Sequence, residues 1–283
     1  MTHGVCLCGT VQYEITEPFQ MMMHCHCSMC RKHHGASFAT FVSAPFAGFK
    51  WLAGEEAVAK YQSSEQGTRS YCRHCGSVTP LLMPDAGVAI APAGNLEGDL
   101  GIKPQAHMFV ASKAPWYEIT DTLPQHAATP PEFGGGEGVH RAPVEQRTGI
   151  ADGSCLCGEV AYEFSNPLRM YHCHCWRCRR GRSAAHATNL FMNLEDFKFT
   201  RGAELVAQYK VPDARFFTVA FCTRCGGGAP RVSRERGAAS VPAGTLDTDP
   251  GIRPQAHIYV ASKAPWFEIT GDVPQYAEMP PEF

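Results

Sequence analysis

Fourteen cysteines are the residues whose type and spacing could do chemistry in this sequence. They fall into CxC and CxxC groups. Each cysteine of the first half has a counterpart in the second half, and the offset ranges from 148 positions for Cys25 and Cys173 to 150 positions for Cys72 and Cys222. Thiolates at such spacings are typical zinc ligands, whereas a disulfide across one intervening residue is strained. Each half holds seven cysteines, an odd number that cannot pair off internally but divides into four plus three.

The set of four in the first half consists of Cys6 and Cys8 near its start and Cys72 and Cys75 farther along. A glycine follows each pair, and glycine permits the tight backbone turn of a thiolate knuckle. Two such pairs together make a closed tetrahedral sulfur site, which contributes folding free energy once zinc is bound. Buried unligated thiols or a redox-active CxxC motif are the alternative. The same expectation holds in the second half for Cys155, Cys157, Cys222 and Cys225.

The set of three in each half is a CxCxxC cluster, made of Cys25, Cys27 and Cys30 in the first half and of Cys173, Cys175 and Cys178 in the second. Three cysteines this close can occupy three corners of a zinc tetrahedron. The open fourth corner would accept water or substrate, which is typical of catalytic zinc. His24, His26 or another group could close that corner instead, or the cluster could hold no stable metal. The sequence therefore predicts up to four zinc ions per chain, two in each half.

Other residues near these clusters have both a catalytic and a structural interpretation. His107 and His257 each follow Pro-Gln-Ala, and they could carry protons near zinc or be hydrogen-bonded structural residues. The arginines around Cys178 could hold the carboxylates of an acidic substrate, or they could form a solvated basic loop. Trp116 and Trp266 are expected to be core or edge aromatics.

The two halves of the chain are copies of one unit. The segment GIKPQAH at 101–107 returns as GIRPQAH at 251–257, VASKAPW at 110–116 returns at 260–266, and PPEF ends both halves. Alternating apolar and polar residues, punctuated by proline and glycine, predict short strands and no long amphipathic helix. The strands expected in the first copy span 11–15, 37–42, 69–72, 88–91 and 107–111. The predicted fold class is all-β.

We expect a first domain over residues 1–133, a glycine-rich linker over 134–151 and a second domain over 152–283. A net charge of −2 argues against a nucleic-acid partner, because phosphate binding requires a basic excess. No stretch approaches the roughly 20 apolar residues that cross a bilayer. The start shows no export signal, so we expect a cytoplasmic protein in a reducing compartment, where disulfides are rare.

The pattern GxCxCGxVxY over 4–13, CHCxxCR over 25–31 and CxxCG over 72–76 resembles the glutathione-dependent formaldehyde-activating enzyme family, whose domain is shared with centromere protein V. The resemblance covers nearly all of both copies. It implies two Mss4-like all-β domains, with a structural zinc on each four-cysteine set and a catalytic zinc on each three-cysteine set. The family's named reaction joins formaldehyde to the thiol of glutathione and gives S-hydroxymethylglutathione.

We therefore expect a zinc-dependent carbon–sulfur lyase-like enzyme that joins glutathione or a similar thiol to formaldehyde or another small electrophile. The alternative is a non-catalytic zinc-binding scaffold or interaction module. Binding to chromatin, as in the centromere relative, is disfavoured by the lack of a basic tail. The two copies are hypothesised to pack as a pseudo-dimer. The second copy has Arg231, Arg234 and Arg236 where the first has Leu81, Pro84 and Ala86, so equal activity of the two copies is not expected.

Overall fold

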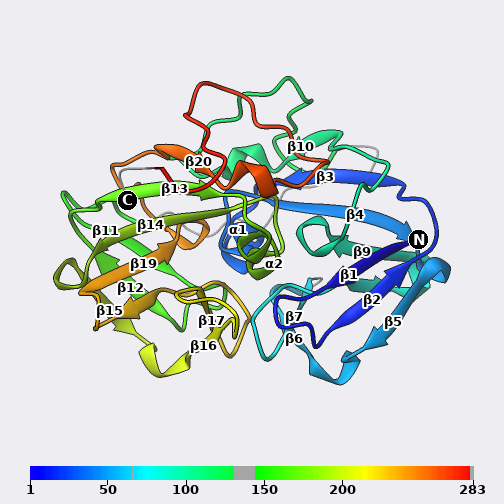
Figure 1. Ribbon diagram of the computed structural model, residues 1–283, viewed down its shortest axis with the longest axis horizontal. Helices are drawn as coiled ribbons and strands as arrows, with labels where there is room; N and C mark the ends of the chain where they lie inside the picture. The colour runs from blue at the N-terminus through cyan, green and yellow to red at the C-terminus, as the bar shows by residue number, and fades with distance from the viewer. Residues whose placement is uncertain (66, 131–143, 281–283) are drawn as a thin grey trace.

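The computed structural model describes residues 1–65, 67–130 and 144–280, and it shows two lobes side by side with two short helices between them (Figure 1). We call the lobes the first and the second repeat. Most of the predicted linker, residues 134–143, lies outside the described residues, as do the PPEF ends at 133 and 283. The first strand of the second repeat begins at Ala151, the last residue of that predicted linker.

Each repeat contains the same three sheets. The three-stranded sheet of the first repeat has the order β1-β2-β5 and the five-stranded sheet the order β10-β3-β4-β9-β8, while β6 and β7 form a hairpin. The strands are β1 (Thr2–Val5), β2 (Gln12–Ile15), β3 (Met21–Cys25), β4 (Ala39–Pro45), β5 (Phe49–Ala53), β6 (Val58–Gln62), β7 (Thr68–Cys72), β8 (Leu81–Met83), β9 (Val88–Pro92) and β10 (Ala106–Met108). Strand β2 shows the alternation that the sequence predicted, since Tyr13 and Ile15 are buried while Gln12 is exposed.

The second repeat follows the same plan, with sheets in the orders β11-β12-β15 and β18-β19-β14-β13-β20 and a β16-β17 hairpin. Its strands are β11 (Ala151–Ser154), β12 (Ala161–Phe164), β13 (Arg169–Cys173), β14 (Ala187–Asn193), β15 (Phe197–Arg201), β16 (Val206–Lys210), β17 (Thr218–Cys222), β18 (Arg231–Ser233), β19 (Ala238–Pro242) and β20 (Ala256–Ile258). The predicted all-β class and the internal repeat are therefore confirmed.

Two strand predictions need correction at their ends. The strand expected over 107–111 ends at Met108, because Phe109 takes a left-handed conformation (φ 60°) and a 3-10 turn follows over Val110–Ser112. The strand expected to begin at 37 begins at Ala39. The left-handed residue Phe109 therefore ends β10 early, and the alternation of apolar and polar residues does not predict such a conformation.

The described residues contain two α-helices, α1 (Ser28–His34) and α2 (Trp176–Arg182), each of seven residues. The thiolate cluster itself helps to start each helix, because the Sγ atom of Cys27 accepts a hydrogen bond from the backbone N–H of Cys30. Helix α1 ends where Gly35 takes a left-handed conformation (φ 63°). The prediction that no long amphipathic helix occurs holds for these residues. Neither helix has the length and apolar character needed to cross a bilayer.

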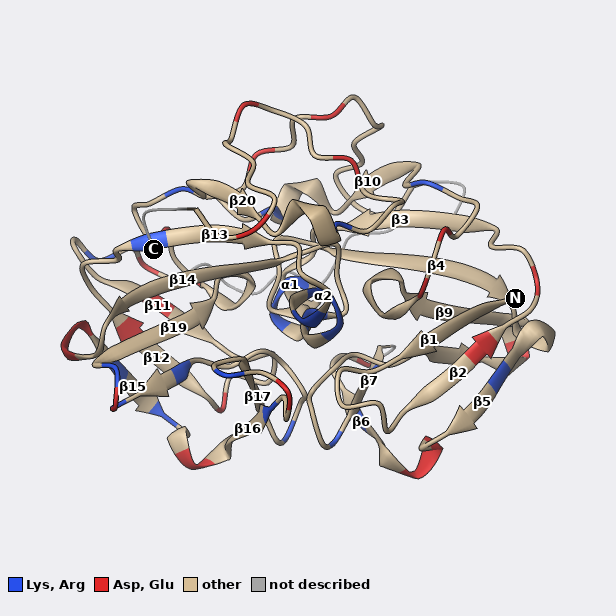
Figure 2. Ribbon diagram, in the orientation of Figure 1, with Lys and Arg blue, Asp and Glu red and all other residues tan. Residues whose placement is uncertain are grey.

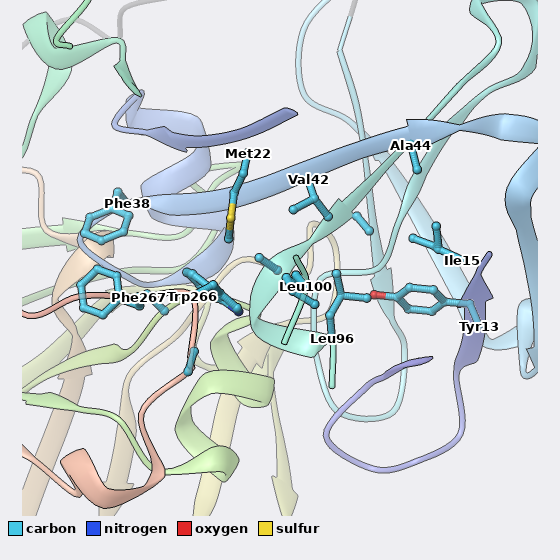
Figure 3. Close-up of a cluster of buried hydrophobic side chains, with 14 residues drawn as sticks. Tyr13, Ile15, Met22, Phe38, Val42, Ala44, Leu96, Leu100, Trp266 and Phe267 are labelled. Atoms are coloured by element: carbon cyan, nitrogen blue, oxygen red, sulfur yellow. The ribbon is translucent and has the colours of Figure 1, made fainter. Parts of the chain in front are cut away.

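The hydrophobic cores exchange a segment between the repeats. Trp266 and Phe267, from the end of the second repeat, pack in the core of the first repeat beside Met22 and Phe38 (Figure 3). Reciprocally, Trp116 packs in the core of the second repeat. Both tryptophans are 2% exposed, so they are buried aromatics as expected, but each completes the core of the other repeat. Neither core is therefore complete without a segment of the other repeat.

The helices dock on the opposite repeat at the centre of the molecule. Helix α1 contacts the 3-10 turn η9 (Ala243–Thr245), and α2 contacts its equivalent η4 (Ala93–Asn95). A Cβ atom on Gly244 would lie 2.3 Å from the carbonyl oxygen of Ala36, so only glycine fits this approach. Lysine and arginine residues gather on both helices where they meet (Figure 2). This docking places the two three-cysteine clusters at the ends of β3 and β13, next to the interface between the repeats.

Candidate metal centres

The four-cysteine set of the first repeat comes together as the sequence predicted. Cys6 and Cys8 follow β1, while Cys72 ends β7 and Cys75 lies in the turn after it. The Sγ atoms of Cys6 and Cys8 are 3.4 Å apart, and those of Cys8 and Cys72 are 3.7 Å apart. A zinc tetrahedron with Zn–S bonds of about 2.3 Å has S–S edges of about 3.8 Å. The four sulfurs therefore have the spacing of a metal cage.

The local backbone supports this cage. Gly9 and Gly76 follow the two cysteine pairs, where the sequence predicted tight turns. Their φ angles of 80° and 72° lie in the left-handed region that favours glycine. The backbone N–H of Val11 donates to the Sγ atom of Cys6 at 3.3 Å. The donors and turns are those of a metal knuckle.

The second repeat has an equivalent cage. The Sγ atoms of Cys155 and Cys157 are 3.4 Å apart, and those of Cys157 and Cys222 are 3.8 Å apart. The remaining member, Cys225, is fully buried and lies within 4.8 Å of the other sulfurs. All fourteen cysteines lie in the described residues and all are free thiols. Both four-cysteine groups could hold a metal ion.

The three-cysteine set of the first repeat is closely packed and covered. Cys25 ends β3, and Cys27 and Cys30 lie at the start of α1, with all three sulfurs within 4.8 Å of one another. The three residues are between 4% and 6% exposed. The guanidinium of Arg69 donates from Nη1 to the Sγ atom of Cys30 at 3.2 Å. The negative charge of Cys30 raises the pKa of Arg69, so this arginine stays charged.

The three-cysteine set of the second repeat opens into a cavity instead. Cys173, Cys175 and Cys178 all line a cavity of about 700 Å³, and Cys175 is only partly buried. Neighbouring thiols lower the pKa of Cys175, so the cluster favours a thiolate there. Six arginines line the same cavity: Arg169, Arg177, Arg182, Arg215, Arg231 and Arg236. The arrangement is a thiolate cluster at the wall of a cationic cavity.

The ring of Phe216 contacts part of this cationic lining. The guanidinium of Arg236 lies 3.6 Å from the ring centroid of Phe216, and that of Arg215 lies 4.6 Å from the same centroid. Arg231 donates from Nη1 to the backbone carbonyl of Phe216 at 2.8 Å. Burial lowers the pKa of Arg182 to about 10, which still leaves it charged at neutral pH. The cavity thus presents several positive charges to a ligand.

The arginines singled out in the sequence divide between two roles. Arg177 and Arg182 line the cavity, whereas Arg180 reaches across the interface and pairs with Glu97 of the first repeat. Arg231 and Arg236 line the cavity, but Arg234 is exposed and does not. Neither a purely solvated loop nor a uniform binding cluster describes this set.

The predicted histidines lie beside the trios without joining them. Nδ1 of His107 forms a hydrogen bond with Nε2 of His26 at 2.8 Å, and the tautomers decide which nitrogen donates. Nε2 of His107 lies 3.0 Å from the Asp121 carboxylate. Burial lowers the pKa of His107, with Asp121 acting in the opposite direction. The counterpart His257 bonds to His174 at 2.9 Å. Within the described residues, the groups whose ligand atoms could share a metal consist of cysteines alone, so no histidine completes either trio.

His107 and His257, together with His24 and His172, line a second cavity of about 660 Å³ between the repeats. His24 and His172 are fixed there through Nδ1 by Thr40 and Thr188, at 2.9 and 2.8 Å. Their rings contribute hydrogen bonds and packing to the interface. The histidine network is therefore explained by its structural contacts.

Sequence reasoning missed two residues that shape these sites, Arg69 and Asp121. Arg69 stands at the position of Val219, a difference that a residue-by-residue comparison of the two copies would have exposed. At the position of Asp121 the second copy has Gly271. The contact of Asp121 with His107 depends on how loops pack across the molecule, so the local sequence does not predict it.

Comparison with known proteins identifies the family of both repeats. The sequence model of the family described as glutathione-dependent formaldehyde-activating enzyme matches residues 1–112 and again residues 150–262. A Halomonas elongata protein that bears the name of such an enzyme is 27% identical over 127 residues, covering 42% of this chain and 81% of the relative. A solved structure of a Rhodobacter sphaeroides protein is 26% identical, covers 34% of this chain and 89% of its own, and gives a TM-score of 0.29. The chain belongs to the glutathione-dependent formaldehyde-activating enzyme family, and it carries the Mss4-like β domain of that family twice in tandem.

Proposed function

We propose that this chain joins a thiol to formaldehyde or another small electrophile at the three-cysteine cluster of the second repeat. The observation that carries the proposal is the cavity of about 700 Å³, whose lining includes Cys173, Cys175 and Cys178 together with several arginines. Membership of the family supplies the reaction class. The proposal names a zinc-dependent carbon–sulfur lyase-type activity, with glutathione or a similar acidic thiol as one substrate.

The donor set fits zinc. Three thiolates within 4.8 Å of one another suit a tetrahedral ion and leave its fourth corner to a ligand from the cavity. When bound, zinc would keep an incoming thiol deprotonated and would polarise an aldehyde oxygen. In the reaction, the thiol sulfur donates an electron pair to the aldehyde carbon and a C–S bond forms. The π pair of the C=O bond moves to oxygen, which takes up the proton that the thiol released, so no oxidant or reductant is needed.

The residues of the chain bind and orient the acidic thiol. Arg231 and Arg236 lie on the cavity wall, and their planar guanidinium groups match carboxylates in a bidentate manner. Arg182 lies near Cys178, where its charge offsets the negative charge of the thiolate cluster. Holding both reactants in one cavity adds a proximity contribution to the rate.

The two four-cysteine cages are proposed as structural zinc sites. In the first repeat the cage joins the β1–β2 loop to the end of β7, so bound zinc ties the start of the repeat to a distant hairpin. Binding energy at such a site is folding energy. Up to four zinc ions per chain follow if both trios are also filled.

The test is turnover of ¹³C-formaldehyde with glutathione, followed by NMR as the hydroxymethyl thioether forms. We expect Cys175→Ser to lose turnover by at least about 100-fold, since it removes a ligand from a cluster that works as a unit. Arg231→Ala should raise the KM for glutathione about tenfold while leaving the KM for uncharged 2-mercaptoethanol within about twofold. The matched control is Arg234→Ala, which removes an arginine that lies outside the cavity. Wild-type turnover by Cys175→Ser would refute the assignment of the reaction to this cluster, whereas no turnover by the wild-type chain would favour a non-catalytic zinc scaffold.

A further inference from the structure

We propose that Arg69 closes the three-cysteine cluster of the first repeat, so that each chain has a single open thiolate cluster, the one in the second repeat. This inference rests on the proposed function, because it asks which of two clusters can accept a thiol. It assigns Arg69 as a residue that blocks ligand access, and it assigns Val219 at the equivalent position as the residue that leaves access open.

The two positions are equivalent by register as well as by sequence. Arg69 on β7 pairs with Tyr61 of β6, and Val219 on β17 pairs with Tyr209 of β16. In the first repeat Nη1 of Arg69 donates to the Sγ atom of Cys30 at 3.2 Å. Valine has no donor and too short a side chain to reach the corresponding Cys178. The same backbone position therefore places a guanidinium on one cluster and leaves the other uncovered.

The space beside each cluster differs as this substitution predicts. In the second repeat all three cysteines line the cavity of about 700 Å³. The hollow at the matching place in the first repeat has about 160 Å³, and Arg69, His33 and Phe41 line it while none of the three cysteines does. His33 stands where the second repeat has Gly181, and Phe41 where it has Asn189. Three larger side chains thus occupy the first site.

The electrostatics favour Arg69 in this closed position. Three thiolates around a divalent ion carry a net charge of −1, and a guanidinium donor on one sulfur offsets it. An incoming thiolate would have to displace this charge-assisted hydrogen bond and leave Arg69 without its partner. Ser63 also accepts a hydrogen bond from Nε of Arg69 at 3.4 Å, which helps to fix the side chain. The first cluster is thereby suited to hold metal structurally and not to exchange ligands.

Cobalt substitution tests this inference without relying on turnover. Co²⁺ in a thiolate site absorbs in the visible range, and its bands shift when a further thiol completes its coordination. We expect titration of the fully cobalt-loaded wild-type chain with glutathione or 2-mercaptoethanol to shift one cobalt per chain. Arg69→Val should raise this number to two, and Arg69→Met, which keeps the length of the stem, should give the same result if valine disturbs the fold.

The reciprocal change supplies the matched control. Val219→Arg should abolish the cobalt response and lower turnover by at least about 100-fold, whereas Val219→Met, of similar length without the charge, should keep the response. Two responsive cobalts in the wild-type chain, one in both Arg69 variants, or loss of the response in Val219→Met would each overturn the role of Arg69. No responsive cobalt in the wild-type chain would instead refute the proposed function, because the second cluster would then lack an open corner.

Discussion

Replacement of Lys32 by methionine tests whether one buried ion pair holds the two repeats together. Lys32 lies on α1 of the first repeat and is 1% exposed, yet its Nζ atom lies 2.6 Å from a carboxylate oxygen of Asp247 in the second repeat. The same ammonium donates to the carbonyl and the hydroxyl of Ser154, each at 2.8 Å. Methionine fills the volume of the lysine stem and supplies none of these donors.

The expected loss follows from the burial of both partners. Removing one partner of a buried ion pair costs about 3–5 kcal/mol, because the remaining charge is left uncompensated. Asp247 is 15% exposed and still accepts a hydrogen bond from Ser154 at 2.6 Å, so the lower end of this range applies. We expect Lys32→Met to lower the free energy of unfolding by about 3 kcal/mol, or roughly a hundredfold in the equilibrium constant.

The duplicated chain offers an internal control. Arg180 is the counterpart of Lys32 and pairs with Glu97 across the same interface, but the side chains are 24% and 53% exposed. An exposed pair contributes about 0–1 kcal/mol, so Arg180→Met should cost at most about 1 kcal/mol. The added change Asp247→Asn should return part of the loss in Lys32→Met, since it removes the unpaired charge.

Equilibrium urea unfolding of the zinc-loaded chain, followed by tryptophan fluorescence, measures all of these variants. The midpoint should fall most for Lys32→Met, least for Arg180→Met, and to an intermediate extent for the double variant. If Lys32→Met and Arg180→Met unfold at the same urea concentration, burial does not govern the strength of these pairs and the reasoning is refuted.

Three further predictions concern the interface, the exchanged core and the metal cages. Gly244→Ala should weaken the docking of α1, because its Cβ would meet the Ala36 carbonyl at 2.3 Å; faster amide exchange in α1 would show it, and unchanged exchange would contradict the packing. Trp266→Ala should cost about 3–5 kcal/mol and should expose first-repeat strands in hydrogen-exchange mass spectrometry, whereas loss of protection in the second repeat alone would contradict the exchange. Cys157→Ser should lower the zinc content and unfold the second repeat on heating, and a chelator should reproduce the effect on the wild-type chain; a metal-free chain that melts like the loaded one would exclude a structural cage.

Local sequence was sufficient for the features that depend on neighbouring residues. The alternation at Tyr13 and Ile15 predicted β2, and the glycines after the cysteine pairs predicted the tight turns found at Gly9 and Gly76. The cysteine spacings grouped all fourteen thiols into the clusters that the structure brings together. In each case the constraint acts over a few residues or recurs in both copies, so it leaves a visible trace in the sequence.

Features that depend on packing across the molecule could not be predicted in the same way. Trp116 and Trp266 have the same apolar character whichever core they enter, so composition cannot tell that each completes the core of the other repeat. The early end of β10 depends on the backbone reversal at Phe109, a residue type that rarely takes a left-handed conformation. Here the folded environment fixes a conformation that local preference opposes.

The exchange of core segments explains how the two copies could diverge at their clusters while both stayed folded. Each core needs a tryptophan segment from the other repeat, and α1 of the first repeat places Lys32 against Ser154 and Asp247 of the second. The first repeat therefore supports the fold of the second whether or not its own cluster binds a ligand. A guanidinium at position 69 costs the chain nothing in this supporting role, because the contacts that join the repeats are made by other residues. Under our proposal, the two copies thus have different tasks: one copy keeps its thiolates covered and supports the other, whose thiolates open into the arginine-lined cavity.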